Sequence, residues 1–258
     1  MRSIERLLEV KGLTKYFGGL AAVSELDFDV YRGEILGLIG PNGAGKTTVF
    51  NLISGFFRPN KGKIMFKGLD ITGLKPHKIA ALGLVRTFQK TLLFGDQTVS
   101  KNISIGLHGE NGNRFSIPIF NSRSDGKKTE RLEQRVIEVL ERMELVEVKD
   151  ELARNLPYGL QRRLGVALAL ATNPELTLLD EPATGMTETE TSDIMDRFRD
   201  IREQGVTILL VEHNMKAVMN TCDRIIVLNF GRKLAEGTPD NIKENRDVIE
   251  SYLGSEED

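Results

Sequence analysis

The chain has 258 residues, enough for one large α/β domain with a sizeable core. Its 35 lysines and arginines nearly balance its 37 aspartates and glutamates, so the charge gives no reason to expect nucleic acid or an anionic membrane as the main partner. The single cysteine, Cys222, excludes an internal disulfide, is expected to be a small core residue, and fits a reducing cytoplasm best.

The amino-terminal residues 1–10 mix charged and apolar side chains, a pattern that is not typical of a signal peptide. The longest apolar runs have the length of a strand, whereas a membrane span needs roughly 20 apolar residues. Any role at a membrane is therefore expected to pass through a partner chain.

Strands open the chain. Apolar and acidic residues alternate over 26–30, which predicts a half-exposed strand. The apolar run over 34–39 predicts a buried strand that ends in a glycine-rich turn, and a helix is expected over about 47–55. A short strand at 64–66 and a turn at Lys67-Gly68 follow.

The middle of the chain changes character. Residues 109–128 are rich in Gly, Asn, Ser, Arg and Lys and predict an irregular, exposed insertion. Apolar residues then recur at helical spacing over 132–143, and a further helix is expected over 159–172.

Strands and helices alternate again in the last third. Buried strands are predicted at 176–179, 206–211 and 224–228, helices at 188–204 and shortly before 254, and a hairpin turn at 229–232. Near-continuous apolar strands between helices predict an α/β fold with a mostly parallel sheet that is covered on both faces.

A phosphate-binding loop follows the strand at 34–39. Eight consecutive residues match the P-loop pattern between a predicted strand and a predicted helix: Gly40, Pro41, Asn42, Gly43, Ala44, Gly45, Lys46 and Thr47. Glycines let backbone N–H groups turn toward phosphate oxygens, and the start of a helix adds partial positive charge. Lys46 is expected to neutralise the β- and γ-phosphates of ATP, Thr47 to bind Mg²⁺, and Thr48 to contact the nucleotide. A glycine-rich loop with a chance lysine is the disfavoured alternative.

Two carboxylates, Asp180 and Glu181, end the apolar strand at 176–179. On a strand beside the P-loop strand, Asp180 is expected to reach Mg²⁺ directly or through water. Glu181 would then polarise the attacking water. Two solvated acids at a strand end are a common alternative, so the catalytic interpretation of the pair depends on the presence of the P-loop in the same chain.

Together these residues resemble the ATP-binding-cassette (ABC) family over essentially the whole chain. Four segments, at 16–20 (YFGGL), 85–89 (VRTFQ), 158–163 (YGLQRR) and 235–239 (AEGTP), are similar to the ATP-binding subunits of bacterial branched-chain amino-acid importers. The resemblance implies one domain over 1–258. Its fold class is α/β: a P-loop NTPase (RecA-like) core with an antiparallel β subdomain and an inserted α-helical subdomain at 90–165.

The resemblance also implies roles for three residues outside these motifs. Phe17 matches the aromatic that stacks on adenine, with Tyr16 as a close competitor and a half-buried hairpin aromatic as the alternative. Gln89 matches the glutamine that approaches Mg²⁺ and the water and links the core to the helical subdomain. His213 matches the histidine that contacts the γ-phosphate and orients the Glu181 water, although a histidine after a strand is often a structural cap.

The signature segment, residues 156–161, departs from the family's Leu-Ser-Gly-Gly-Gln, which contacts the ATP of a partner subunit. Pro157 has neither a hydroxyl nor an N–H and suits the first turn of a helix, Tyr158 is bulky, and Gly159 can still present its amide. Thr187 is a second departure, where the family usually has Asp or Asn. We therefore expect a chain that binds and hydrolyses ATP well but completes its partner's site less well.

The resemblance implies an ATP-hydrolysing importer subunit, with ATP and Mg²⁺ as cofactors, for branched-chain amino acids, amides or urea. Expected partners are a like or unlike second ABC ATPase, integral-membrane permease subunits and, through the complex, an extracytoplasmic solute-binding protein, but no nucleic acid. The expected location is cytoplasmic, on the inner face of the membrane. Alternatives are an exporter of lipid or lipopolysaccharide and, less favoured, a cassette acting on DNA or ribosomes.

Overall fold

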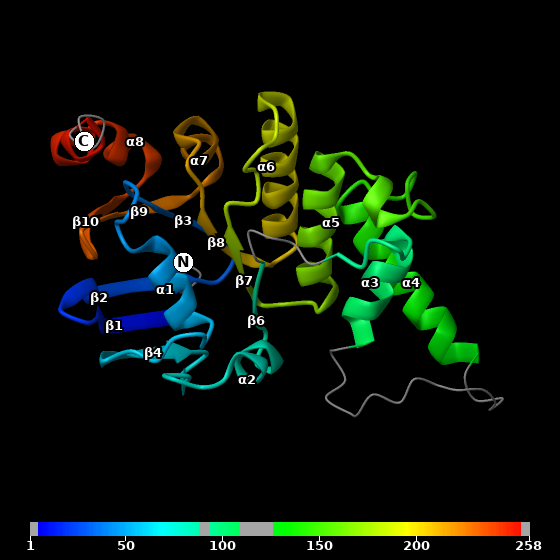
Figure 1. Ribbon diagram of the computed structural model, residues 1–258, viewed down its shortest axis with the longest axis horizontal. Coiled ribbons are helices and arrows are strands. Elements are labelled where there is room, and N and C mark those ends of the chain that lie inside the picture. Colours follow the sequence, from blue (N-terminus) through cyan, green and yellow to red (C-terminus); the bar gives the residue numbers. More distant parts are fainter. Residues whose placement is uncertain (1–4, 88–92, 109–125, 254–258) are drawn as a thin grey trace.

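Two β-sheets form the framework of the computed structural model, which describes residues 5–87, 93–108 and 126–253 (Figure 1). The first sheet is antiparallel and has the strand order β2-β1-β4-β5. Its members are β1 (Arg6–Phe17), β2 (Leu20–Tyr31), β4 (Lys61–Phe66) and the short β5 (Leu69–Asp70). In β2 the apolar side chains of Leu26, Phe28 and Val30 are buried while Asp27 is exposed, so the alternation predicted a half-exposed strand correctly.

The second sheet has six strands in the order β10-β9-β3-β8-β7-β6, and only β10 runs antiparallel. The strands are β3 (Ile35–Ile39), β6 (Leu84–Arg86), β7 (Leu176–Asp180), β8 (Thr207–Val211), β9 (Arg224–Asn229) and β10 (Arg232–Gly237). The mostly parallel α/β sheet and the hairpin turn at 229–232 are confirmed.

The expectation that the strand of Asp180 lies directly beside the P-loop strand is wrong. β8 pairs with both β3 and β7 and so separates them. All five residues of each of these three strands are buried, so their apolar patterns are alike and could not show their order in the sheet.

Helices pack against the sheets, and α3, α4 and α5 form a separate group on the right in Figure 1. They are α1 (Lys46–Ile53), α2 (Pro76–Ala81), α3 (Val99–His108), α4 (Gly126–Arg142), α5 (Tyr158–Ala171), α6 (Glu188–Glu203), α7 (Met215–Thr221), α8 (Pro239–Lys243) and α9 (Arg246–Leu253). The helices at α2, α3, α7 and α8 were not predicted. Of the expected irregular insertion, 109–125 lies outside the described residues, and 126–128 already belongs to α4.

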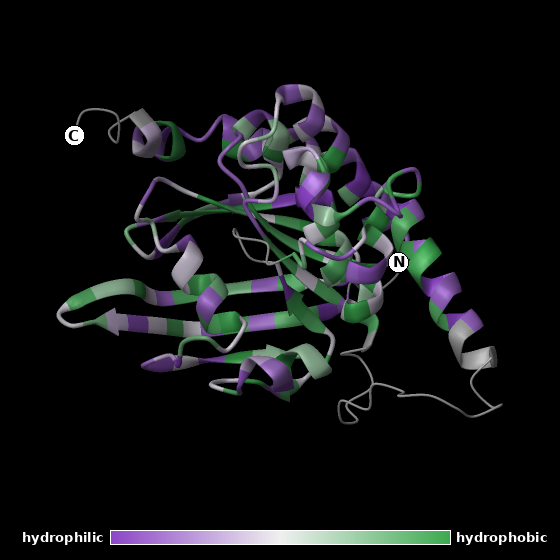
Figure 2. Ribbon diagram, turned by 45° about the vertical axis from the view of Figure 1, so that its right-hand side comes forward, coloured by the Kyte–Doolittle hydropathy of each residue, from purple (hydrophilic) through white to green (hydrophobic). Residues whose placement is uncertain are grey.

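Alternate residues of the six-stranded sheet face two separate apolar cores. Ile35 and Ile39 of β3 pack in a core with α4, α5 and α6, whereas Leu36 and Leu38 pack in a core with α1 and the antiparallel sheet. In Figure 2 the central strands are mostly hydrophobic, while the helices carry both colours. Cys222 is buried, as expected, and burial raises the pKa of its thiol. Within the described ranges, no helix is both long and apolar enough to cross a membrane.

Candidate nucleotide-binding site

The P-loop joins β3 to α1, as the sequence predicted. Gly45 adopts a φ of +103°, and a Cβ there would lie 2.5 Å from the carbonyl oxygen of Ala22, so only glycine fits between the loop and β2. Helix α1 begins at the next residue, Lys46, with no acidic side chain in its first turn and no side-chain cap. Its first N–H groups therefore present partial positive charge that no carboxylate of the same helical turn offsets.

The ammonium group of Lys46 lies inside this loop. Lys46 is 6% exposed, and its Nζ donates to the carbonyl oxygens of Gly40 at 2.6 Å and Pro41 at 2.9 Å. Burial lowers the pKa of Lys46, and the carboxylates of Glu181 and Asp180 oppose that shift. A largely buried cation held by carbonyl dipoles is a site that an anion can enter favourably.

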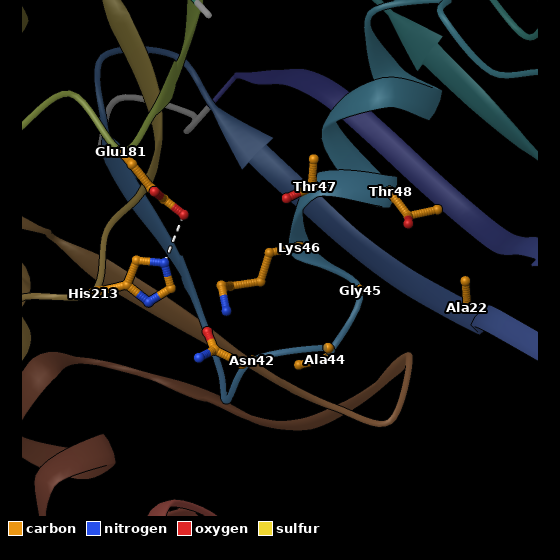
Figure 3. Close-up of a pocket in the computed structure, with 10 residues that line it drawn as sticks. Ala22, Asn42, Ala44, Gly45, Lys46, Thr47, Thr48, Glu181 and His213 are labelled. Carbon is orange, nitrogen blue, oxygen red and sulfur yellow. Dashed lines mark hydrogen bonds and ion pairs between the residues drawn. The ribbon is translucent and has the colours of Figure 1, made fainter. Parts of the chain in front are cut away.

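A pocket of about 210 Å³ opens beside the P-loop (Figure 3). Ten residues line it: Ala22, Asn42, Gly43, Ala44, Gly45, Lys46, Thr47, Thr48, Glu181 and His213. All except Ala22 were predicted site residues. Ala22 comes from β2, and nothing in its sequence context distinguishes it from other small strand residues.

Glu181 and His213 meet across this pocket although they are far apart in the sequence. The Nε2 atom of His213 lies 2.6 Å from Oε1 of Glu181 (Figure 3). Glu181 has a φ of +49°, and its N–H donates to the carbonyl of Val211 at 2.8 Å, which holds it against the end of β8. Because β7 and β8 are neighbours, the residues that follow the two strands reach the same place.

Glu212 fastens the ends of these two strands together. Its carboxylate is 3% exposed and accepts from the N–H of Ala183 at 2.7 Å and from the N–H of His213 at 3.1 Å. Burial raises the pKa of Glu212, and the two backbone donors oppose that shift. Glu212 was not predicted as a site residue, because an acid after a buried strand is common.

Asp180 is held by an arginine that was not predicted. Its Oδ2 lies 2.7 Å from Nη2 of Arg86, and the two side chains are 2% and 6% exposed. Nη1 of Arg86 donates to Asn51 at 2.7 Å and to Ser54 at 3.2 Å, both in or next to α1. The other carboxylate oxygen, Oδ1, is buried, and no residue in the described part of the chain forms a hydrogen bond with it.

These oxygens fit a magnesium ion bound together with a nucleotide. Mg²⁺ prefers one or two protein oxygens plus phosphates and water. The Thr47 hydroxyl and the unpartnered Oδ1 of Asp180 are oxygen donors of that kind. Among the described residues, no group of three or more His, Cys, Asp or Glu side chains could hold a metal ion by itself.

The aromatic candidates lie in the hairpin that supplies Ala22. Phe17 ends β1, is 44% exposed, and packs edge-on against Phe57 with ring centroids 5.3 Å apart. Tyr16 beside it is 41% exposed. Neither lines the pocket, so the ring contact fits the hairpin interpretation and the role toward adenine stays a prediction. Gln89 lies outside the described residues.

The signature segment begins α5. Pro157 is the N-cap residue, one position before the first turn in which it was expected, and its side chain makes no capping hydrogen bond. The hydroxyl of Tyr158 donates to the carbonyl of Thr184 at 3.1 Å. Thr187 is the N-cap of α6 and forms a capping box with Glu190. Tyr158 and Thr187 therefore both have partners within their own chain.

Comparison with known proteins decides the family. A family model described as "ABC transporter" matches residues 23–184, and one described as "Branched-chain amino acid ATP-binding cassette transporter" matches 232–258. The chain belongs to the ABC transporter family. It is an ATP-binding subunit, an ATP hydrolase coupled to transport, as the sequence predicted.

Relatives of this ABC subunit cover nearly its whole length. It is 43% identical, over 249 residues, to the high-affinity branched-chain amino acid transport ATP-binding proteins BraF of Pseudomonas aeruginosa and LivG of Escherichia coli K12, covering 96% of this chain and 98% of each relative. A nucleotide-free ATP-binding cassette from an ABC transporter superposes with a TM-score of 0.83 at 30% identity, covering 96% of this chain and 98% of that one. The ADP conformation of a cassette gives 0.84 at 31%, covering 96% and 99%. The predicted fold class is confirmed.

Proposed function

We propose that this ABC subunit hydrolyses Mg²⁺-ATP in the pocket beside the P-loop to power the import of branched-chain amino acids or related small polar solutes, such as amides and urea. The observation that carries the proposal is the convergence of Lys46, Glu181 and His213 on one pocket that Thr47 also lines. A cation for phosphate, a carboxylate for water and a hydroxyl for metal are the groups that phosphoryl transfer to water requires.

The P-loop would bind the phosphates of ATP. Lys46 is already turned into the loop, where its ammonium donates to two carbonyl oxygens. A bound phosphate would replace part of that contact with a stronger, charge-assisted hydrogen bond. Mg²⁺, when bound, would offset the negative charge of the phosphates. Thr47 and Oδ1 of Asp180 would hold it, with Gln89 as the further ligand that the resemblance implies.

Glu181 would orient the attacking water and accept its proton as the water oxygen bonds to the γ-phosphorus and the bond to the β–γ bridging oxygen breaks. The 2.6 Å contact with His213 Nε2 holds one carboxylate oxygen, Oε1, and the other, Oε2, would face the water while it also accepts from the Thr184 hydroxyl. His213 would also contact the γ-phosphate, where negative charge develops. Positioned general bases contribute roughly 10²–10⁴-fold to rate.

The partners follow from the family. We propose that the chain pairs with a second ABC ATPase subunit, like or unlike, and that the start of α5, with Pro157, Tyr158 and Gly159, faces the nucleotide of that partner. The helical region 90–165 would contact integral-membrane permease subunits at the inner face of the membrane, and an extracytoplasmic solute-binding protein would deliver the solute. The names of BraF and LivG, which state branched-chain amino acid transport, support this solute class.

Replacing Glu181 by Gln tests the catalytic assignment. We expect ATP hydrolysis to fall by roughly 10²–10⁴-fold while ATP still binds, measured by phosphate release and by calorimetric titration. Glu203→Gln is the matched control, because that side chain is 71% exposed at the end of α6 and should leave both values unchanged. Equal hydrolysis by the wild type and the Glu181 variant would refute the assignment.

Two further measurements test the partner and the solute. The mass of Glu181→Gln in solution, with and without Mg²⁺-ATP, shows whether two copies close around nucleotide. An ATP-dependent dimer supports pairing with itself, and a monomer that binds ATP points to an unlike partner. Leucine uptake by cells that lack this chain should return with the wild type and not with Glu181→Gln. Export of lipid without leucine uptake would overturn the importer assignment.

A further inference from the structure

The start of α5 is tied to the loop that follows Glu181 within the same chain. The Tyr158 hydroxyl donates to the carbonyl oxygen of Thr184 at 3.1 Å. Gly185, the next residue, has a φ of +82°, and a Cβ there would lie 2.9 Å from Cε1 of the Tyr158 ring. The ring thus packs against a backbone that only glycine lets come so close.

The same loop holds the carboxylate of Glu181. The Thr184 hydroxyl donates to Oε2 of Glu181 at 3.3 Å. The other oxygen, Oε1, lies 2.6 Å from Nε2 of His213. Because one partner contacts each oxygen, the plane of the carboxylate is fixed from both sides, and a shift of Thr184 would release one of them.

The Tyr158 ring is itself held in place. The guanidinium group of Arg162, one turn later in α5, lies 5.2 Å from the ring centroid, and Arg162 is 9% exposed. A Cβ at Gly159 would lie 2.3 Å from Oε1 of Glu190, so the first turns of α5 and α6 are also in close contact. Tyr158 is 49% exposed, so Arg162 and the loop after Glu181 contact only one part of the side chain.

We propose that Tyr158 is a positioning residue for ATP hydrolysis in its own chain: by holding the Thr184 backbone, it keeps the Thr184 hydroxyl on the Glu181 carboxylate. This inference rests on the proposed role of Glu181 toward the attacking water. The proposed role can be distinguished from a role for Tyr158 in the partner's nucleotide site. Only in the proposed role does the effect of removing the Tyr158 hydroxyl depend on the hydroxyl of Thr184.

A double-mutant cycle separates the two routes. Tyr158→Phe removes the hydroxyl and keeps the ring, and Thr184→Val removes the hydroxyl of Thr184 and keeps its carbonyl and shape. A hydrogen bond of this kind changes a rate by about 3- to 10-fold. We expect each variant to lower kcat by that factor with an unchanged KM for ATP, and the double variant to be no slower than Thr184→Val alone.

Controls exclude a merely structural effect. Thr184→Ser keeps a hydroxyl and should retain wild-type kcat. Tyr31→Phe is the matched tyrosine control, because Arg224 lies 4.9 Å from the Tyr31 ring in the same kind of stack and Tyr31 lies outside the pocket. ATP affinity should be equal in all these variants, and their unfolding midpoints should differ by no more than roughly 6 °C, the effect of one hydrogen bond.

Each outcome decides either the inference or the proposed function. If the wild type hydrolyses ATP, Glu181→Gln does not, and Tyr158→Phe has the wild-type kcat, the inference is wrong and the proposed function stands. Losses that multiply in the double variant, or a raised KM with unchanged kcat in Tyr158→Phe, would place the hydroxyl on another route and also overturn it. If Glu181→Gln is as active as the wild type, the proposed function itself fails.

Discussion

Breaking the buried ion pair between Arg86 and Asp180 should destabilise the fold even without nucleotide. The pair joins the end of β6 to the end of β7, its side chains are 6% and 2% exposed, and Arg86 also donates to Asn51 and Ser54. The guanidinium group lies 5.6 Å from the ring centroid of Phe50. Arg86→Met keeps an apolar stem beside that ring and removes the charge.

The loss of stability expected for Arg86→Met follows from the burial of Asp180, the partner that remains. Removing one member of a buried ion pair lowers the free energy of unfolding by about 3–5 kcal/mol, because the other charge stays buried in the low-dielectric interior without a partner. For a chain of this size each kcal/mol lowers the unfolding midpoint by roughly 2–4 °C, so we expect a drop of roughly 6–20 °C. Thermal and urea unfolding in the absence of nucleotide and added metal measure it.

Two controls show whether the unpaired charge is the cause. The double variant Arg86→Met with Asp180→Asn has no unpaired charge and should recover at least half of the lost stability. Arg154→Met breaks an exposed pair with Asp96, whose side chains are 61% and 82% exposed, and should cost below about 1 kcal/mol. An Arg86 variant no less stable than the Arg154 variant would refute the reasoning.

Three further predictions follow from the site. Phe17→Ala should raise the Kd of ATP by roughly 5- to 150-fold in calorimetry, since base–aromatic stacking contributes about 1–3 kcal/mol, whereas Tyr16→Ala should not; the reverse ranking would assign the stacking ring to Tyr16. Burial raises the pKa of Glu212 above its ordinary value of 4.5, so the contribution of Glu212 to stability is full below the unfolded-state pKa and is lost as the pH rises through the folded-state pKa. Glu212→Gln should lack this loss. Curves of unfolding free energy against pH that run parallel for the wild type and the variant would contradict the prediction. Gly185→Ala and Gly205→Ala both place alanine at positive φ, which costs about 1–2 kcal/mol. Of these two glycines only Gly185 faces an aromatic ring, so Gly185→Ala should lower the free energy of unfolding more than Gly205→Ala does. Equal losses of unfolding free energy would refute the close contact.

The parts of the site that the sequence predicted are those fixed by local chemistry. A run of glycines before Lys46 and Thr47 serves phosphate binding wherever it lies between a strand and a helix. Apolar strands followed by carboxylates likewise identified Asp180 and Glu181. In both cases the predicted residues are neighbours in the chain, so their spacing alone suffices to propose the site.

The parts that were missed or wrong depend on which strands are neighbours. Arg86 meets Asp180 because β6 pairs with β7, and Glu212 meets Ala183 because β7 pairs with β8. The strands β3, β7 and β8 are equally apolar, so no periodicity orders them, and β8 was not expected between the other two. His213 was assigned only by family resemblance for the same reason.

The contacts of Thr187, Pro157 and Tyr158 change what their departures from the family pattern imply for a partner's site. Thr187 caps α6, and Asp or Asn would cap a helix start equally well, so its change gives no reason to expect unequal sites. Pro157 stands before the helix, and its side chain makes no capping hydrogen bond to the first turn. What a partner's nucleotide would lose is therefore one hydroxyl and one N–H at Pro157, because the bulk of Tyr158 is placed on Thr184 and Gly185 of its own chain. The expectation that this chain completes its partner's site less well thus rests on these two missing groups at Pro157.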